Sequence, residues 1–210
     1  MSLKHDLQNI ISGNGSVRHG ENIQAITSYL RRKKEAISRA QEKEYSKDQE
    51  TEILVEFIHQ NSLWFRDLDD PKYIGAGAEQ KVYDYTDPRY ILKLNDTIFY
   101  RSWYDYFNNL LIHNYFFEDV PYHLVGFLNL ENKLNAVVIQ PYIRTVESTD
   151  LSIVKELLAL NGFTNKKNND YYHPDLGIII EDLHDENVLT SDGVLQFIDT
   201  VIYLTDAFYL

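Results

Sequence analysis

Cysteine is absent from the 210 residues, and its absence excludes several kinds of chemistry at once. A chain without thiols has no disulfide framework, no thiolate metal site and no cysteine nucleophile. Basic residues are also scarce, because 20 Lys and Arg stand against 32 Asp and Glu, which gives a net charge of −12. Nucleic acids and anionic membranes bind surfaces with excess positive charge. We therefore expect no nucleic acid and no membrane among the partners, whereas an anionic small ligand stays possible.

Long apolar runs are missing too, since no stretch approaches the roughly eighteen residues of a membrane helix. The N-terminus does not resemble a signal peptide, so the sequence predicts a non-secreted, cytoplasmic protein. What is present is typical of a globular chain, with 44% apolar residues and sixteen tyrosines. The length suits one ordinary domain or two small lobes.

The N-terminal part of the sequence predicts helices. Residues 4–62 have helical periodicity, with a polar break at residues 16–22 in which Asn22 is a plausible N-cap. Residues 31–50 are charged and of mixed sign, which is typical of a solvated helix face and which we favour over a binding tract. A further helix is expected at about residues 49–60 because its apolar residues lie on one side.

After these helices the pattern changes to strands. Glycine and Asp-Pro turns divide residues 72–95 into three strands, and residues 122–143 read as two strands around a tight turn. A helix is expected between them, from Thr97 to about Glu118. A short helix at about residues 149–160 and a hairpin at residues 171–180 follow. Mostly antiparallel strands with segregated helices predict an α+β fold.

Two acids interrupt apolar strands in the last part of the sequence, although burying an unpaired charge is costly. Asp182 follows the apolar residues 178–180, Asp199 follows a second apolar strand, and Asn187 lies between the two acids. A turn at residues 191–193 can form a hairpin that brings Asn187 and Asp199 to the same end. An amide oxygen beside a carboxylate is a hard ligand set that suits Mg²⁺ and its attached phosphates. Asp182 could then orient or deprotonate a hydroxyl.

The same stretch resembles the catalytic loop and metal aspartate of the protein-kinase-like superfamily. The segments D-L-H-D-E-N and F-I-D are similar to His-Arg-Asp-x-x-x-x-Asn and Asp-Phe-Gly, with the same spacing from Asp to Asn (187 − 182 = 5). The Asp-Leu-His form is more similar to aminoglycoside phosphotransferases, and the nearest resemblance is to the small kinase domain of polyvalent proteins of bacterial mobile elements. This resemblance implies a phosphotransferase that uses ATP and Mg²⁺. It implies that Asp182 is the catalytic base and that Asn187 and Asp199 hold the metal.

Upstream segments resemble the nucleotide-binding half of the same superfamily. The stretch IGAGAEQKVY is similar to a glycine-rich loop, in which Gly75 and Gly77 approach phosphate and Val82 covers adenine. Gln80 takes the place of the third glycine of that loop. The stretch YILKL resembles the strand whose lysine, here Lys93, binds the α- and β-phosphates. Simple alternation, with Lys93 on the wet face of an ordinary strand, is the competing interpretation.

The stretch VVIQPYI resembles the hinge, where backbone groups of Gln140 and Tyr142 would bind adenine. Pro141 between them has no N–H and cannot donate. The acidic partner of Lys93 normally lies in the helix that follows its strand, and here we favour Glu118 because helical spacing puts it near the apolar face.

The sequence also departs from the family pattern. Asp105, the other acid of the expected helix, projects away from the apolar face, and Ile180-Glu181 replace the usual His-Arg. Eleven residues follow Asp199 (210 − 199 = 11), so we expect no helical peptide-docking half. The acceptor hydroxyl, on a protein or on a small molecule, is not determined.

Other interpretations stay open. Asp182 and Asn187 suit an ordinary polar loop, and Asp199 suits a strand-end cap. One alternative function is a nucleotide-binding pseudokinase that acts as an interaction module, and another is a scaffold that binds no nucleotide. For the kinase-like interpretation, the expected organisation is a helical extension at 1–65, an N-lobe sheet with one packed helix and the hinge at 66–143, and a reduced C-lobe at 144–210.

Overall fold

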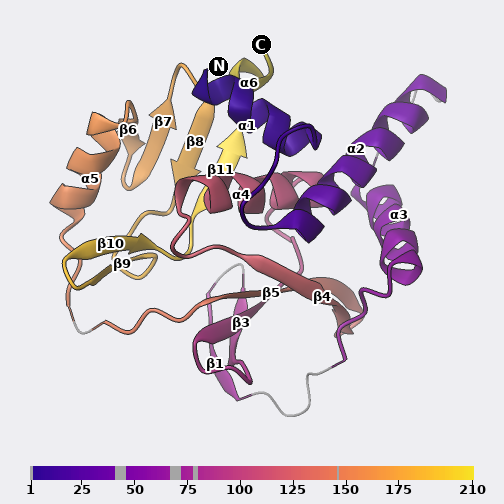
Figure 1. Ribbon diagram of the computed structural model, residues 1–210, viewed down its shortest axis with the longest axis horizontal. Helices are drawn as coiled ribbons and strands as arrows, with labels where there is room; N and C mark the ends of the chain where they lie inside the picture. The colour runs from indigo at the N-terminus through magenta and orange to yellow at the C-terminus, as the bar shows by residue number, and fades with distance from the viewer. Residues whose placement is uncertain (1, 41–45, 67–71, 78–79, 146) are drawn as a thin grey trace.

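The computed structural model describes residues 2–40, 46–66, 72–77, 80–145 and 147–210, which form a mixed α+β structure (Figure 1). The helices are α1 (Leu3–Ser12), α2 (Glu21–Ala40), α3 (Lys47–Gln60), α4 (Trp103–Phe116), α5 (Leu151–Leu160) and α6 (Asp206–Tyr209). The strands are β1 (Tyr73–Ala76), β2 (Lys81–Asp84), β3 (Tyr90–Asn95), β4 (His123–Leu130), β5 (Lys133–Pro141), β6 (Thr164–Lys167), β7 (Asp170–His173), β8 (Ile178–Glu181), β9 (Val188–Ser191), β10 (Val194–Phe197) and β11 (Val201–Leu204). Antiparallel pairing between these strands confirms the α+β expectation.

The N-terminal helices form where the sequence predicts them, with small differences at their starts. Helix α2 begins at Glu21 directly after the polar break, so Asn22 lies inside the helix and is not its N-cap. Helix α3 begins at Lys47 because Ser46 and Gln49 form a capping box, in which each side chain bonds the other residue's backbone N–H. Within the described residues, no helix is both long and apolar enough to cross a membrane.

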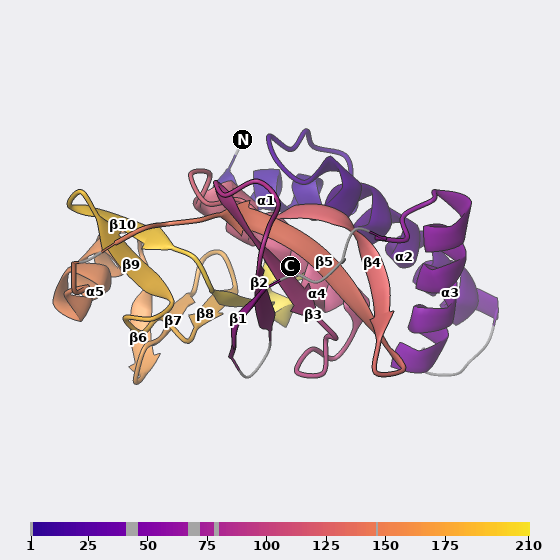
Figure 2. The same cartoon turned by 90° about the horizontal axis from the view of Figure 1, so that it is seen from below.

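The larger sheet has five strands in the order β1-β2-β3-β5-β4. Strand β4 turns into β5 through Glu131 and Asn132, whose φ angles of 54° and 62° suit a two-residue hairpin turn. The expectation that residues 75–94 and 124–139 share one antiparallel sheet is confirmed. The neighbouring helix α4 covers one face of this sheet, and Figure 2 shows the sheet in front of it.

The expected helix from Thr97 to Glu118 is shorter at both ends in the structure. Helix α4 starts at Trp103, where Ser102 is the N-cap, and ends at Phe116. The residues before it turn instead, because the Asn95 side chain accepts the N–H of Thr97 at 2.7 Å. Short polar side chains compete with helical hydrogen bonds in this way.

The smaller sheet has the order β11-β8-β7-β6, and β9 pairs with β10 in a separate hairpin. The hairpin at residues 171–180 is confirmed by β7 and β8, and the turn at residues 191–193 joins β9 to β10. Strand β6 was not predicted because Thr164–Lys167 has no apolar residue, so its pairing with β7 defines it.

Helix α4 runs through the middle of the molecule, between the five-stranded sheet and helices α1 and α2 (Figure 1). One buried cluster joins α2, α3, α4 and the sheet, and it contains Phe107 and Leu110 of α4. A second cluster joins Ile112 of α4 to α1 and to the smaller sheet. Two cores therefore meet on one helix, and this helix holds the two sheets relative to each other.

Candidate active site

The central residue of β3, Lys93, points into the molecule and not to solvent. Its neighbours Leu92 and Leu94 pack on the outer face of the sheet, and its cross-strand partner Val138 belongs to the core beneath α4. Alternation along the strand therefore turns Lys93 inward, where it is 2% exposed. The interpretation of Lys93 as an ordinary wet-face lysine is wrong.

The Lys93 amine meets the segment that contains Asp199. Its Nζ donates to the carbonyl oxygen of Ile198 at 2.9 Å and lies 5.3 Å from the centre of the Tyr122 ring. Burial lowers the pKa of Lys93, and the negative charge of Asp199 opposes this shift. The sheet and the C-terminal part of the chain thus place a cation and an anion together, as the sequence predicts for a nucleotide-phosphate site.

The Asp199 carboxylate contacts two side chains that are far away in the sequence, and Gln80 bonds it. Gln80 donates its amide N–H to Asp199 Oδ1 at 2.5 Å, and the Tyr122 hydroxyl lies 3.5 Å from the same oxygen. The hydroxyl has one proton, which it donates to the nearer carbonyl oxygen of Ile198 at 3.0 Å. Burial and the charge of Asp199 raise the pKa of Tyr122 well above its ordinary value.

Sequence reasoning missed Tyr122 entirely, because nothing in its neighbourhood indicates a site. For Gln80 there was a signal, namely its position at the third glycine of the loop, but its contact with Asp199 spans 119 residues. Such contacts depend on the tertiary fold and leave no local pattern.

The residues of the predicted catalytic loop, Asp182 and Asn187, contact each other. The Asn187 amide nitrogen lies 2.9 Å from the backbone oxygen and 3.0 Å from a carboxylate oxygen of Asp182. Asp182 has φ 63°, an uncommon left-handed conformation for a residue that is not glycine. His184 lies between them in sequence, and its backbone N–H donates to the carbonyl oxygen of Asp182 at 3.0 Å.

Asn187 also connects this loop to Asp199. Its carbonyl oxygen accepts the N–H groups of Ile198 at 2.9 Å and of Asp199 at 3.3 Å. The contact follows from the β9–β10 register, in which Val188 faces Phe197 and the residues just outside the hairpin come together. The prediction that Asn187 and Asp199 lie at the same end of a hairpin is therefore confirmed.

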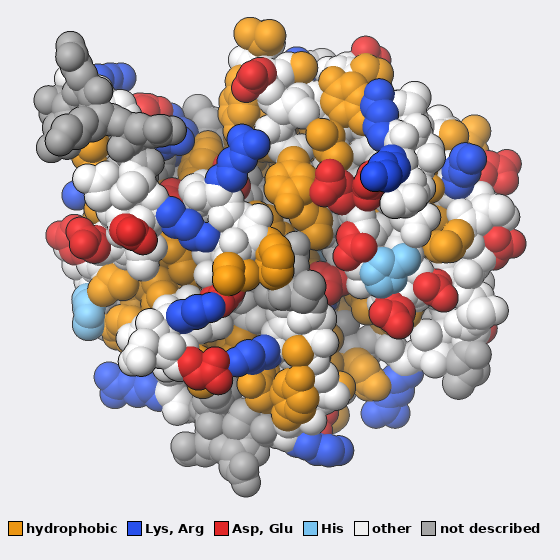
Figure 3. Space-filling model, turned by 180° about the vertical axis from the view of Figure 1, so that it is seen from behind, with side chains coloured by type: hydrophobic (Ala, Val, Ile, Leu, Met, Phe, Trp, Pro, Cys, Tyr) orange, Lys and Arg blue, Asp and Glu red, His pale blue; other side chains and the backbone are white. Residues whose placement is uncertain are grey.

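Acidic groups surround this loop. Figure 3 shows acidic side chains gathered near apolar ones on the side where β6, β7 and β8 lie. The N–H of Asp182 donates to the carboxylate of Asp170 at 3.3 Å. Burial, followed by the charges of Asp170 and Asp182, raises the pKa of Glu181. A cationic group near the loop would relieve this repulsion.

The glycine-rich segment forms the β1–β2 hairpin, whose residues 78–79 lie outside the described part of the chain. Gly75 pairs with Val82, and the N–H of Gly77 donates to the carbonyl oxygen of Gln80 at 3.0 Å. A Cβ built on Gly75 or Gly77 meets no described atom within 4 Å. Among the described residues, nothing packs against the faces of these two glycines. Val82 faces Lys93 across β2 and β3.

The expected hinge lies at the end of the β3–β5 ladder. The Tyr142 N–H donates to the carbonyl oxygen of Arg89 at 2.8 Å, which continues the β3–β5 pairing beyond Pro141. Gln140 pairs with Ile91 within that ladder. One backbone group of the expected hinge, the Tyr142 N–H, is thus used by the sheet, and the assignment of backbone groups of Gln140 and Tyr142 to adenine stays a prediction.

The expectation that Glu118 is the acidic partner of Lys93 is wrong. Because α4 ends at Phe116, Glu118 lies beyond the helix at the surface, where it forms an ion pair with Arg18. Asp199 is the acid whose charge acts on Lys93. Asp105 lies in the first turn of α4, where its N–H donates to the Ser102 side chain.

Two side chains of α4 hold the residues that follow Asp199. His113 is buried and burial lowers its pKa to about 3, so the ring is neutral at physiological pH. Its Nε2 lies 3.0 Å from the carbonyl oxygen of Val120, which can only accept, so Nδ1 accepts from the Thr200 hydroxyl at 2.8 Å. Asn109 Oδ1 accepts the N–H of Ile202 at 2.9 Å.

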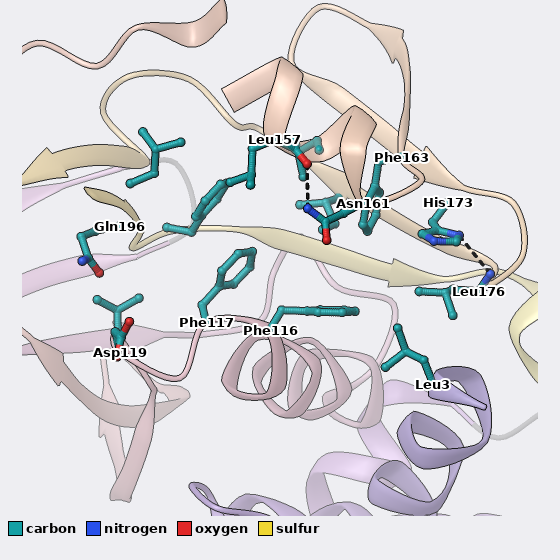
Figure 4. A pocket seen from close by; sticks show the side chains of 15 residues that line it. Leu3, Phe116, Phe117, Asp119, Leu157, Asn161, Phe163, His173, Leu176 and Gln196 are labelled. Carbon is teal, nitrogen blue, oxygen red and sulfur yellow. Dashed lines mark hydrogen bonds between the residues drawn. The ribbon is translucent and has the colours of Figure 1, made fainter. Parts of the chain in front are cut away.

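A cavity of about 320 Å³ lies on the other side of Val120 from His113, with Val120 in its lining (Figure 4). It lies between the end of α4, the end of α5 and strand β10, with Phe116, Phe117, Leu157 and Phe163 among its lining residues. Lys93, Asp182, Asn187 and Asp199 are not among its lining residues. This cavity is therefore separate from the candidate active site.

An inward-facing strand lysine, a glycine turn, an Asp-x-x-x-x-Asn loop and a following aspartate, brought together in this way, have the arrangement of a protein-kinase-like site. The family model described as "Serine/Threonine/Tyrosine Kinase found in polyvalent proteins" matches residues 47–206. The chain belongs to this family, and the resemblance that its sequence suggested is confirmed. No curated protein and no solved structure matches the chain. Membership implies a kinase-like fold and the use of ATP.

Proposed function

We propose that this protein is a phosphotransferase that uses Mg·ATP and moves the γ-phosphoryl group to a hydroxyl of a protein or small molecule. The observation that carries the proposal is the meeting of Lys93 with Asp199, which in turn adjoins the Asp182–Asn187 loop. We propose residues 66–143 as the N-lobe and 144–210 as a reduced C-lobe, with residues 1–65 as the helical extension.

The residues present fit a magnesium nucleotide. Mg²⁺ in such sites is bound by one or two protein oxygens together with substrate phosphates and waters. Asp199 offers a carboxylate, and Asn187 offers Oδ1 because its amide nitrogen is engaged with the backbone and carboxylate of Asp182. In the described part of the chain no group of three or more His, Asp and Glu could hold a metal, which agrees with a site completed by phosphates.

Each side chain then has a distinct task. Bound Mg·ATP supplies the transferable phosphoryl group and neutralises the charge that develops on it. Lys93 fixes the phosphates with a charge that its buried surroundings leave poorly solvated. Gly75 and Gly77 let the backbone approach the phosphates, and Asp182 orients the acceptor hydroxyl and takes its proton.

A calorimetric titration with ATP, in the presence and absence of Mg²⁺, tests the proposal. We expect binding that is clearly tighter with Mg²⁺, and a mass spectrum that shows a phosphoryl group on the protein itself or on an offered hydroxyl compound. Binding without transfer would indicate a pseudokinase. Absence of any nucleotide binding would leave a scaffold and contradict the proposal.

One observation favours the pseudokinase as a second candidate. Gln80 donates to Asp199 Oδ1 at 2.5 Å and so occupies one of the two carboxylate oxygens that could hold a metal. If this contact persists when nucleotide binds, the ATP affinity of the wild type does not depend on Mg²⁺, whereas the ATP affinity of Gln80→Ala does. If bound Mg·ATP displaces Gln80 from Asp199, the ATP affinity of the wild type already depends on Mg²⁺. Hydrogen bonds to charged groups contribute about 1.5–3 kcal/mol, so Gln80→Ala then binds Mg·ATP more tightly by roughly 10- to 150-fold.

A further inference from the structure

The first turn of α4 is held by an acid from a different helix. Glu50 of α3 is buried, and its carboxylate accepts the N–H of Trp103 at 2.6 Å and the N–H of Tyr104 at 3.3 Å. These N–H groups have no partner within their own helix, and the N-terminus of a helix favours a negative charge. Burial raises the pKa of Glu50, while the two hydrogen bonds oppose the shift. Glu50 therefore adds a second cap to α4, beside the local cap from Ser102.

Two neighbours of Glu50 hold the residues around the same point. The Lys47 amine donates to the carbonyl oxygen of Tyr100 at 2.9 Å and also to that of Thr97. Thr51 Oγ1 accepts the indole N–H of Trp103 at 3.0 Å. Residues 47, 50 and 51 lie on one side of α3 because they are three and four positions apart. One helix thus fixes the start of α4 through a base, an acid and a hydroxyl.

The next two turns of α4 contact the segment that contains the metal-site acid. Asn109 and His113 are four residues apart, so they lie on one face of α4. Asn109 accepts the Ile202 N–H and His113 accepts the Thr200 hydroxyl, at 2.9 Å and 2.8 Å. Asp199 directly precedes these two partners. A shift of α4 along its axis would break both contacts and move the backbone next to Asp199.

We propose that α3 is a positioning element of the active site, which fixes α4 and, through α4, the segment that carries Asp199. The inference deepens the proposed function and rests on it for the role of Asp199. The family match supports it independently, because the match begins at Lys47, the first residue of α3, and leaves α1 and α2 outside. Buried charges contribute little net stability. The polar contacts of α3 therefore suit a role in fixing position.

The test compares full-length Glu50→Gln with Lys47→Met, which removes a different contact to the same point. Glu52→Gln is the matched control, since Glu52 is exposed on the same helix. One measurement follows hydrogen exchange at the amides of Trp103 and Ile202 without ligand, well below the melting temperature. The other measures the dissociation constant for ATP with and without Mg²⁺.

In Glu50→Gln we expect exchange of the Ile202 amide to become about tenfold faster, which corresponds to about 1.4 kcal/mol of lost protection. We expect the dissociation constant for Mg·ATP to rise by a similar factor while metal-free ATP binding stays nearly constant. Lys47→Met should change both quantities in the same direction, and Glu52→Gln should change neither.

Faster exchange confined to Trp103, with unchanged Mg·ATP affinity, would overturn the proposal and leave α3 a merely stabilising helix. The two readouts also separate this proposal from the function on which it rests. If the wild type binds no Mg·ATP but Ile202 exchange still responds to Glu50→Gln, the phosphotransferase fails while the positioning by α3 stands. If the wild type binds Mg·ATP and Ile202 does not respond, the positioning fails alone.

Discussion

Lys93 is a buried cationic residue, whose amine lies in the interior on the helix-covered face of β3. Burial disfavours its charged form, and the charge of Asp199 offsets that effect in part. Asp199 is in turn bonded by Gln80, so the site holds two opposite charges before any ligand arrives. Anionic phosphates beside Lys93 and a cation beside Asp199 would each lower the free-energy cost of burying the neighbouring charge.

Substitution of Lys93 tests the free-energy cost of burying its charge. The pKa of Lys93 is lowered below its ordinary 10.5, so the folded state binds this proton less tightly than the unfolded chain. The destabilisation is present at neutral pH and vanishes as the pH rises toward 10.5. Because burial outweighs the attraction of Asp199 in lowering this pKa, we expect Lys93→Met to raise the free energy of unfolding at neutral pH and to lose that advantage in alkali. Urea unfolding at several pH values measures it, and a gain that grows with pH would contradict the assignment.

The two aspartates should respond differently to substitution. Asp199→Ala removes the proposed metal ligand, so we expect the Mg²⁺-dependent part of ATP binding to disappear. Asp182→Asn keeps the shape of the loop but cannot take a proton, so binding should stay while transfer falls by about 10²–10⁴-fold. Calorimetry with a transfer assay separates the two effects. Equal losses of binding in both variants would mean that Asp182 is not the base.

At the scale of elements, the sequence predicts most helices and strands because their periodicity and turns are local. Helix α3 is predicted from its apolar periodicity but begins two residues earlier than the expected residue 49, at the Ser46 cap, and the start of α4 is missed where a polar turn competes, as at Thr97. Strand β6 escapes prediction because pairing alone defines it. The loop that carries Asp182 and Asn187 is predicted from its spacing, whereas the surface position of Glu118 depends on the end of α4.

Two glycines in similar backbone conformations allow a controlled test of element packing. Gly177 and Gly193 have φ angles of 69° and 73°. A Cβ on Gly177 would lie 2.3 Å from the backbone nitrogen of Phe208 in α6, whereas one on Gly193 meets no described atom within 4 Å. We expect Gly193→Ala to lower the free energy of unfolding by about 1–2 kcal/mol from the backbone conformation alone.

For Gly177→Ala we expect a clearly larger loss in the same denaturant titration, because α6 must move as well. The difference between the two variants measures the contact of α6 with the turn before β8. Equal losses would show that α6 does not pack there.

At the scale of the whole molecule, segments distant in the sequence hold the site together. The side chains of Lys4 and Gln8 in α1 donate to backbone oxygens of α6 at 2.5 Å and 2.6 Å, which brings the two ends of the chain together (Figure 1). Contacts of this kind have no local sequence signal. The same is true of the contacts of Tyr122 at the site and of Glu50 at the start of α4. They explain why the residue types of the site could be predicted while its supporting residues could not. The division at residue 65 stays a prediction.

A crystal structure with Mg²⁺ and a non-hydrolysable ATP analogue tests the central claim most directly. The account predicts phosphate oxygens within hydrogen-bond distance of Lys93 Nζ and a metal ion on Asp199 and Asn187 Oδ1. It also predicts that the Gln80 amide has left Asp199 Oδ1. A nucleotide bound elsewhere, or a Gln80–Asp199 contact that persists with no metal beside it, would contradict the account.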